Sequence, residues 1–556
     1  MSRTAPLDSV ETRETDAAAT RAAERGTALS YVARDKWLVL ILTAFILCGF
    51  GLRLVNLSRV GFAEDEINKL EAVRAYERGD ITPNAEHPML MKSLIFVSMQ
   101  ASRAWNNTSA LKISDESAAR FPNVLFGALT VVPLFLLAAA LFDRRTALLS
   151  AALWAFGTNA ITYNRIAKED TLLVFFMLFA FYFYLRAKQT SGFDPKGKKR
   201  NYVLSGASFG LMMASKYFPH YFGLNMLYHH LVRVREREPG EPKGKTPGLF
   251  YLMLLVAFLV ANPAVLLPQT LSYLNAYTSG SLLTHTGYLM GDVLYKNNMS
   301  ATPFRGTPLY FYVLYLLIKV PLPVIVSLIV GLAAAFRRPR HPGHAFLLLM
   351  FLLWIVPYSL MGAKWLRYTL SLLPFVYMLS AVGIVALMNL FASRLKSMKQ
   401  ERLAQIVCVA LIAFFVAWPA WTAVASNPHY AAYTNALGGG RAGYYFPHDE
   451  FYDDGLREAI EFVCKDAPRG AVIVGETPAV FRYYLEVFGR TDLQSRVLSD
   501  PKFELATAGR PAYIIIQKGR TYFENREKMK EVRERYPKVF DIRVRGESAA
   551  EVYKIE

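Results

Sequence analysis

The sequence predicts an α-helical polytopic membrane protein that ends in a small extracytoplasmic α/β domain. Three observations support this fold class. The 556 residues are 53% hydrophobic, the apolar residues lie in long uninterrupted runs, and Lys and Arg gather in alternate connections between these runs. A helix needs about 20 apolar residues to cross the hydrocarbon core of a bilayer, and a soluble fold does not require so many runs of this length.

About eleven runs approach the length of a membrane-spanning helix. They cover residues 37–57, 119–142, 147–163, 170–186, 201–217, 219–233, 248–268, 309–336, 344–361, 366–392 and 403–424. Residues 37–424 are therefore predicted to form one transmembrane domain. Residues 1–36 are polar and without apolar periodicity, which is typical of a disordered cytoplasmic tail.

The basic residues predict the orientation, because short loops rich in Lys and Arg stay on the cytoplasmic side. With eleven spans, all six basic segments fall on one side: 3–36, 144–145, 196–200, 233–245, 337–340 and 394–402. We therefore expect a multipass protein of the plasma (inner) membrane with a cytoplasmic N-terminus. The net charge of +19 is mainly an orientation signal. Nucleic-acid binding is not expected, because no aromatic residues interleave the short basic clusters.

Two regions outside the membrane are long enough to fold. The first external loop, residues 58–118, is predicted to hold helices at about 66–78 and 89–105. Residues 425–556 form the predicted α/β domain, in which AVIVGE and AYIIIQKG are strands and LREAIEFVC and ENREKMKEVRERYP are helices. The acidic residues of FPHDEFYDDG (446–455) are expected to cap the helix that follows and not to carry the chemistry.

Asp65 and Glu66 lie a few residues beyond the first span, at the depth of the lipid head groups. Acidic residues at a helix start are stabilised by the helix dipole, and this structural role is one interpretation. The other is a general base or charge stabiliser for an acceptor hydroxyl. Glu86 and His87 follow in the same loop. They are either solvated side chains or, with Asp65 or Glu66, ligands of a divalent metal.

Cations gather at the predicted outer ends of other spans. These cations either extend their charges to the membrane interface or bind a phosphate, and they are Arg120, Arg165, Lys168 and Arg367. Arg suits a phosphate because its guanidinium can engage two oxygens at once. A second group of candidates for contacts with a substrate or a metal comprises Asp170, His285, Tyr288 and Lys319. Among them Lys319 lies within an apolar span, where an ionisable residue is a functional candidate by default.

These motifs, in this order, resemble those of the bacterial protein O-mannosyltransferases and lipid A aminoarabinose transferases of the GT-C glycosyltransferase superfamily. The matching segments are the Asp-Glu pair, EHPML, SAARFPNVLFGALT, NRIAKEDTLLVFF, LYFYVLYLLIKVPLP, LRYTLSLLP and NPHYAAYTNALGGG. Met89 departs from the resemblance, because the family motif usually has a second Pro at this position. The preceding Glu64 also blurs which carboxylate is the family's first, and we align the pair with Asp65 and Glu66.

The resemblance implies a GT-C-like fold and an inverting transfer of a sugar from a polyprenyl-phosphate donor. The acceptor would be a protein, lipid or glycan on the non-cytoplasmic face, with Asp65 as the base. The alternative is a multipass transporter or flippase of a lipid-linked glycan. Transporters place ionisable residues near the bilayer midplane and often have two related halves. Here most of the notable charges lie at one external edge and no duplication is visible. A non-catalytic subunit of an envelope complex is a third hypothesis.

Overall fold

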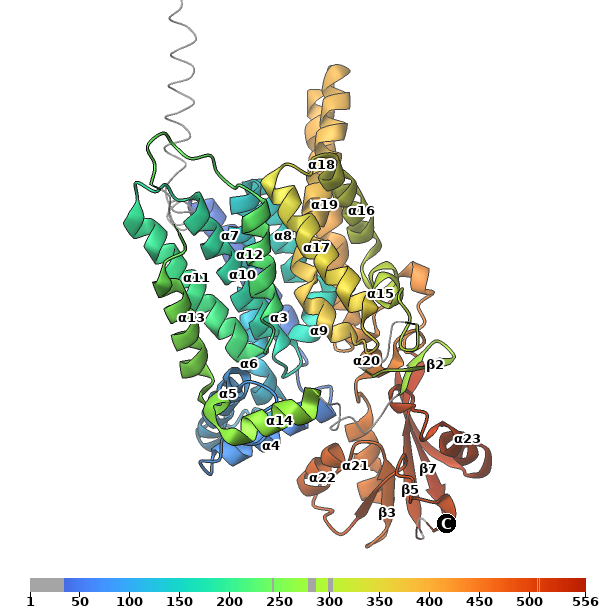
Figure 1. The fold of residues 1–556 in the computed structure, drawn as a ribbon. Helices are drawn as coiled ribbons and strands as arrows, with labels where there is room; N and C mark the ends of the chain where they lie inside the picture. The colour runs from blue at the N-terminus through green and yellow to red at the C-terminus, as the bar shows by residue number, and fades with distance from the viewer. Residues whose placement is uncertain (1–34, 243–244, 279–286, 299–303, 508, 510) are drawn as a thin grey trace, which may run out of the picture.

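The computed structural model describes residues 35–242, 245–278, 287–298, 304–507, 509 and 511–556. A bundle of helices stands on a smaller domain with a β-sheet, and this domain holds the C-terminus (Figure 1). The bundle consists of α3 (Lys36–Leu54), α6 (Asp115–Leu129), α7 (Val131–Leu141), α8 (Arg144–Phe156), α9 (Thr158–Asn164), α10 (Asp170–Gln189), α11 (Pro195–Ser215), α12 (His220–Leu231), α13 (Gly248–Ala261), α15 (Phe311–Lys319), α16 (Leu322–Arg337), α17 (Pro342–Leu360), α18 (Leu373–Ser397) and α19 (Glu401–Ser426), with the 3₁₀ turns η1 (Pro263–Leu266) and η2 (Leu366–Ser371).

The chain is an integral multipass membrane protein. In the described part of the chain, six helical stretches are long and apolar enough to span a bilayer: α3, α6 with α7, α10, α17, α18 and α19. The other predicted spans form shorter or interrupted helices. The predicted span 147–163 is divided between α8 and α9 at Gly157, and the predicted span 309–336 is divided before Pro321. Pro321 has no N–H to continue a helical hydrogen-bond ladder.

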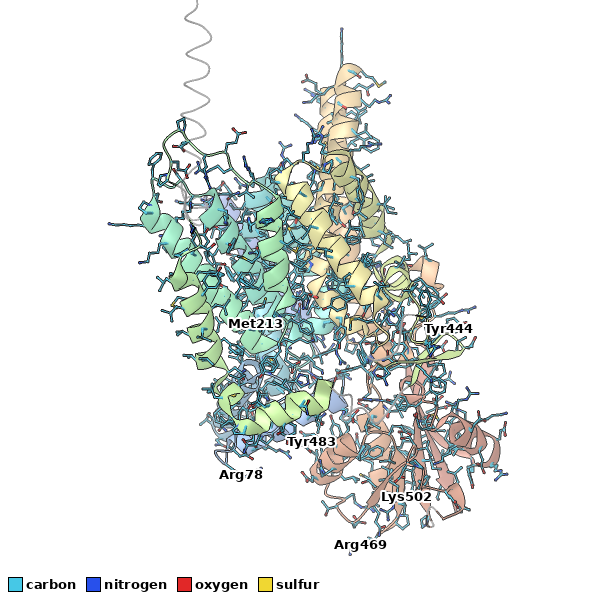
Figure 2. The ribbon with its side chains drawn as sticks, viewed as in Figure 1. Arg78, Met213, Tyr444, Arg469, Tyr483 and Lys502 are labelled. Carbon is cyan, nitrogen blue, oxygen red and sulfur yellow. The ribbon has the colours of Figure 1, made fainter. Side chains whose placement is uncertain are left out.

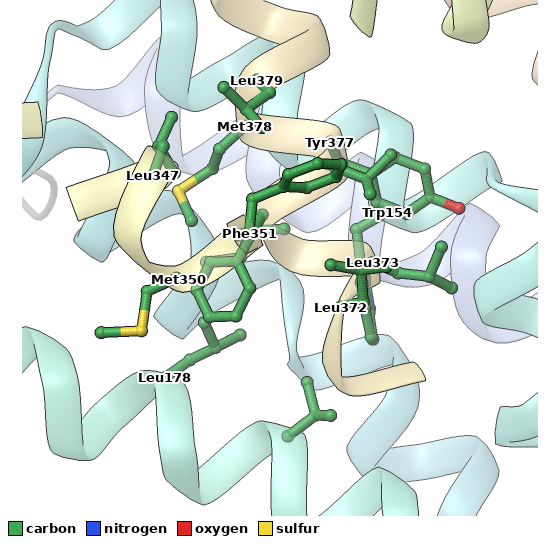
Figure 3. Close-up of a cluster of buried hydrophobic side chains, with 14 of the residues drawn as sticks. Trp154, Leu178, Leu347, Met350, Phe351, Leu372, Leu373, Tyr377, Met378 and Leu379 are labelled. Atoms are coloured by element: carbon green, nitrogen blue, oxygen red, sulfur yellow. The ribbon is translucent and has the colours of Figure 1, made fainter. Parts of the chain in front are cut away.

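Close helix packing holds the bundle together. Trp154 and Tyr377 pack edge to face with ring centroids 6.3 Å apart, in a buried cluster that α10 and α17 complete (Figure 3). The backbones of α16 and α18 touch at Gly331 and Gly383, where an added Cβ would lie 1.9 Å from a carbonyl oxygen of the facing helix. Small residues permit such approaches between helices in lipid.

Short elements cover the end of the bundle that faces the C-terminal domain (Figure 1). They are α4 (Glu64–Tyr76), α5 (Met89–Thr108), α14 (Pro268–Thr278) and the antiparallel hairpin β1 (Gly287–Met290) and β2 (Val293–Lys296). The two helices predicted in the first loop, 66–78 and 89–105, are thus confirmed. The turn between α18 and α19, with its basic residues, lies at the opposite end (Figure 1). Which end faces the cytoplasm stays a prediction.

The C-terminal domain has a mixed sheet of five strands in the order β4-β3-β5-β7-β6. Strands β3 and β5 are parallel and fully buried, which explains their continuous apolar sequences. The structure confirms the two predicted strands, AVIVGE and AYIIIQKG, and the two predicted helices, LREAIEFVC and ENREKMKEVRERYP. The strands are β3 (Val472–Gly475), β4 (Gln494–Val497), β5 (Ala512–Gln517), β6 (Lys538–Val544) and β7 (Glu547–Ile555), and the helices are α20 (Pro447–Phe451), α21 (Leu456–Asp466), α22 (Pro478–Val487) and α23 (Arg526–Arg535), with the 3₁₀ turns η3 (Tyr430–Ala432), η4 (Ala436–Gly438), η5 (Leu505–Thr507) and η6 (Lys518–Arg520).

Helix α22 joins this domain to the bundle. Tyr483 lies at the contact (Figure 2), where its ring packs against Phe62 at 5.4 Å and its hydroxyl donates to Asp115. The neighbouring Tyr484 accepts a hydrogen bond from the Phe62 N–H and donates one to Glu116. One buried apolar cluster runs through both parts. The C-terminal domain is therefore held firmly next to α4, the helix that carries Asp65.

Candidate active site

The first turn of α4 presents Asp65 to side chains from three distant segments. Its Oδ2 accepts hydrogen bonds from Lys168 Nζ at 2.6 Å, Arg367 Nη1 at 3.1 Å and Tyr452 OH at 2.7 Å. Lys168 lies in the connection between α9 and α10, Arg367 lies in η2, and Tyr452 follows α20. The structure thus brings together Asp65, Lys168 and Arg367, which the sequence predicted, and adds Tyr452.

The cations determine the charge state of this group. Burial raises the pKa of the Asp65 carboxyl, but the positive charges of Lys168 and Arg367 outweigh it and hold the pKa well below its usual range. The pKa of Lys168 is lowered to about 8, mainly by burial and next by repulsion from Arg367. The negative charge of Asp65 raises this pKa but does not offset the two effects. The Arg367 guanidinium also lies over the rings of Trp365 and Tyr368. Asp65 is therefore an ionised, tightly held carboxylate with weak basicity in this state.

Glu66 turns away from Asp65 and binds Arg120. Arg120 donates from Nε to Glu66 Oε1 at 2.8 Å and from Nη2 to Glu66 Oε2 at 2.6 Å. Its other three N–H groups donate to the carbonyls of residues 57, 60 and 61. All five guanidinium N–H groups are occupied. This geometry favours structural roles for both residues over the predicted roles in catalysis and phosphate binding.

Arg165 also makes structural contacts. Its guanidinium donates to the carbonyls of Arg53, Val55 and Asn56 and lies 5.0 Å from the centre of the Tyr430 ring. These contacts tie the end of α3 to the segment that follows α19. The structure does not bring Arg165 into the group around Asp65, and the predicted phosphate contact is not supported by its hydrogen bonds.

Lys319 lies at the end of α15 and does not extend to the interface as a snorkelling side chain would. Its Nζ donates to the Ala431 carbonyl at 2.7 Å and lies 3.3 Å from Glu450 Oε1. Both side chains of the ion pair are almost inaccessible. Lys319 thus anchors residues 431–450 to the bundle.

A second network lies beside Asp65 and contains two residues that the sequence analysis did not select, Lys69 and Glu169. Lys69 Nζ contacts Glu169 Oε1 at 2.9 Å, and His87 Nδ1 lies 3.6 Å from the same oxygen. Burial lowers the pKa of His87 to about 3, so its ring is neutral at physiological pH. Asp170 instead pairs with Lys216 at 2.6 Å.

The described residues do not assemble the metal site that was one of the two interpretations of Glu86 and His87. Glu86 Oε1 accepts a hydrogen bond from Asn84 Nδ2 at 2.7 Å, while Asp65 and Glu66 are bound to cations. In the described ranges, no three His, Cys, Asp or Glu residues converge as metal ligands. His285 lies outside the described residues.

The acidic segment after α19 does not cap α21, contrary to our expectation. The N-cap of α21 is Gly455, without a side-chain cap, because Asp453 turns instead to Arg520 and to the Glu64 N–H. Tyr452 and Asp453 both have left-handed backbone conformations, with φ of 44° and 65°. Such strain in non-glycine residues persists only where the surroundings hold it. Nothing in the periodicity of the sequence could have signalled these contacts.

Asp449 of α20 is another acidic residue directed into the site. Its Oδ2 accepts from Tyr288 OH at 2.5 Å, and its Oδ1 accepts from the Leu366 N–H at 3.1 Å. Tyr288 was a sequence candidate, and the structure places it against Asp449. The contact links hairpin β1–β2 to α20 and η2.

Two cavities meet at this point. The smaller, which we name the cationic cavity, is lined by Lys168, Asp170, Arg367 and Tyr163. The larger, which we name the junction cavity, lies between residues 57–66 and residues 428–454, and Arg120 and Arg165 also line it. Both are lined by Ile166, Asp449 and Tyr452. Two adjoining spaces thus share one wall beside Asp65.

Comparison with known proteins finds a family model that matches part of the chain and solved structures with a similar fold. Residues 104–267 match the family model described as dolichyl-phosphate-mannose-protein mannosyltransferase. The structure matches ArnT from Cupriavidus metallidurans bound to undecaprenyl phosphate with a TM-score of 0.50 and 14% identity, over 93% of this chain and 98% of that chain. ArnT in the apo state matches with a TM-score of 0.47 and 14% identity, over 93% and 97% of the two chains.

The apo oligosaccharyltransferase of Archaeoglobus fulgidus matches with a TM-score of 0.49 and 12% identity, over 87% of this chain and 70% of that chain. No curated protein matches the sequence. The family match covers residues 104–267, less than half of the chain, and the likeness to ArnT is a likeness of fold.

Proposed function

We propose that the protein transfers a sugar from a polyprenyl-phosphate donor to an acceptor on the non-cytoplasmic face of the membrane. The observation that carries this proposal is the convergence of Asp65, Lys168 and Arg367 beside one cavity. Glycosyl transfer from a phosphate needs both types of group. Cations stabilise the departing phosphate, and a carboxylate takes the proton of the attacking hydroxyl.

Lys168 and Arg367 are the proposed ligands of the donor phosphate. Each has N–H groups beyond the one that contacts Asp65, because an ammonium has three donors and a guanidinium has five. Both line the cationic cavity. The ArnT structure with the matching fold contains undecaprenyl phosphate, which supports a polyprenyl phosphate as the carrier here.

Asp65 is the proposed general base. A bound phosphate would compete with Asp65 for Lys168 and Arg367, and the carboxylate would regain basicity as these cations turn to the donor. The acceptor oxygen then forms a bond to the anomeric carbon while the bond from that carbon to the phosphate oxygen breaks. The hydroxyl proton moves to Asp65, and the phosphate leaves on its carrier. A single displacement of this kind inverts the anomeric carbon and needs no covalent enzyme intermediate.

The domain organisation and orientation follow as parts of the same proposal. Residues 37–424 form the transmembrane glycosyltransferase domain, with loop 58–118 and the domain 425–556 on the non-cytoplasmic side. The carrier's apolar chain would lie among the membrane lipids, and the acceptor would reach the site from outside. The acceptor is a protein, a lipid or a glycan.

The direct test uses purified protein in lipid nanodiscs with undecaprenyl-phosphate mannose, glucose, arabinose and aminoarabinose, each offered with water as the acceptor. Mass spectrometry measures the release of undecaprenyl phosphate. We expect release from at least one donor by the wild type, and a strong loss in Asp65→Asn. Asp292→Asn is the matched control, since Asp292 also accepts from a tyrosine, Tyr444, but is exposed. Transport of an intact lipid-linked sugar without release from any donor would favour a flippase and contradict the proposal.

A further inference from the structure

A second carboxylate, Asp449, lies in the wall that separates the cationic cavity from the junction cavity. Three segments hold it: α20 carries it, β1 supplies the Tyr288 hydroxyl, and η2 supplies the Leu366 N–H. The Tyr288 ring is fixed in turn by edge-to-face packing on Phe311, with centroids 5.5 Å apart. The position of the Asp449 carboxylate is therefore well defined.

The hydrogen bonds of Asp449 leave it with spare capacity. An ionised carboxylate has about four lone-pair sites, and two of these are occupied by the Tyr288 and Leu366 donors. Both donors are neutral. Burial raises the pKa of Asp449 to about 6, which still leaves the group mainly ionised at neutral pH.

The neighbouring acids differ from Asp449, because each pairs with a basic side chain. Glu450 pairs with Lys319, Asp453 with Arg520, and Asp454 with His429. For Asp449, the described ranges contain no such ion pair. A buried anion without a cationic partner is destabilising, and proteins retain such groups mainly at functional sites. Asp449 therefore has the properties expected of a carboxylate that receives a further hydrogen bond from a bound ligand.

The occupant must carry hydrogen-bond donors. A carboxylate accepts hydrogen bonds from hydroxyl or ammonium groups, and it repels phosphate and carboxylate groups at short range. The donor phosphate is thus excluded as its partner. The junction cavity, on the other side of Asp449, is lined by residues 428–431 of the segment that follows α19 and by Arg120 and Arg165, whose guanidinium groups are held by other contacts.

We propose that Asp449 binds the acceptor, by accepting a hydrogen bond from a hydroxyl or ammonium group next to the attacking oxygen, and that it selects against acceptors with an anionic group at this point. The inference rests on the proposed function. Asp65 remains the base that takes the proton, and Asp449 orients the nucleophile and rejects like charge.

The test compares wild type with Asp449→Asn. The amide can keep both contacts, since its oxygen can accept from the Leu366 N–H and its NH₂ can donate to the Tyr288 hydroxyl, so the fold is expected to remain. The probes are glycerol as a neutral acceptor and glycerol 3-phosphate as an anionic one, with the donor that the wild type hydrolyses. Mass spectrometry measures transfer to each probe relative to hydrolysis by water.

We expect Asp449→Asn to lower transfer to glycerol, relative to hydrolysis, by roughly tenfold, the usual effect of one lost charge-assisted hydrogen bond. Transfer to glycerol 3-phosphate, relative to hydrolysis, should change less than transfer to glycerol. The ratio of transfer to glycerol over transfer to glycerol 3-phosphate should therefore fall in the variant. Hydrolysis itself should stay within about twofold of wild type, because water is small and needs no orienting partner. Asp292→Asn serves as the control with unchanged ratios.

Two outcomes would overturn the inference. If Asp449→Asn keeps both transfer and hydrolysis at wild-type rates, Asp449 does not contact the acceptor. If transfer and hydrolysis fall equally, Asp449 acts on the donor side. A wild type that releases carrier from no donor would instead refute the proposed function, so the two failures are distinguishable.

Discussion

Replacement of Arg120 by alanine should lower the free energy of unfolding, while the folded protein should still bind the donor phosphate. Arg120 and Glu66 form a bidentate pair whose side chains are 4% and 1% exposed, so solvent does not screen the charges. Removal of one partner from a buried pair typically costs about 3–5 kcal/mol, because the other charge stays buried. Glu66 would keep hydrogen bonds from the Ala63 and Ala167 N–H groups. We therefore expect the lower end, about 3 kcal/mol.

The assay is unfolding of the purified protein in detergent, followed by tryptophan fluorescence, together with binding of undecaprenyl phosphate below the unfolding temperature. Arg103→Ala is the matched control. Arg103 also pairs with a glutamate, Glu77, at 2.6 Å, but it is 45% exposed. Exposed pairs contribute only about 0–1 kcal/mol. The double change Arg120→Met with Glu66→Met should recover part of the loss, since no charge is left unpaired.

One result would refute this reasoning. If Arg120→Ala unfolds like wild type but binds undecaprenyl phosphate at least tenfold more weakly, Arg120 contacts the donor phosphate as the sequence predicted. The structural interpretation of its five hydrogen bonds would then be wrong.

Three further predictions concern the cavities. Asp65→Asn should lower donor turnover by about 10²–10⁴-fold, because the general base is lost. The variant should bind undecaprenyl phosphate at least as tightly as wild type, because Lys168 and Arg367 lose their competing carboxylate, and weaker binding would contradict this arrangement. Lys168→Met and Arg367→Gln should each weaken undecaprenyl phosphate binding by roughly tenfold or more, as expected for a lost charged contact, and unchanged affinity in both would contradict the assignment. Transfer to glycerol relative to hydrolysis should decline as the pH falls below about 6, where Asp449 becomes protonated, and should be flat in Asp449→Asn. The charged or titratable groups that act on Asp449 are Arg367, Lys319, Glu450 and the tyrosines Tyr163, Tyr288, Tyr312 and Tyr315. A decline that persists in Asp449→Asn would assign it to another group.

Adjacent residues in a motif can have unrelated roles, and the sequence does not reveal this. Asp65 and Glu66 are neighbours in α4, but successive residues of a helix point in directions about 100° apart. Asp65 therefore meets Lys168, Arg367 and Tyr452, while Glu66 meets Arg120. The motif predicted that charged residues gather here, but not which carboxylate meets which cation.

The sequence by itself determined the features that depend on local pattern. Apolar runs gave the bundle helices and the buried strands β3 and β5, because burial and backbone hydrogen bonding act over a few neighbouring residues. The ordered motifs also resembled those of the superfamily and selected Asp65, Lys168 and Arg367 as site candidates, without predicting that they pair.

Only the tertiary structure decided the contribution of the C-terminal segment. Tyr452 reaches Asp65 across 387 positions of sequence, and Asp449 reaches Leu366 across 83. The local pattern favoured helix capping for these acids, since a capping bond needs only a nearby N–H. Buried partners from distant segments prevailed, because a buried polar group must be hydrogen-bonded and the fold supplied Tyr288, Leu366 and Arg520 at the required places.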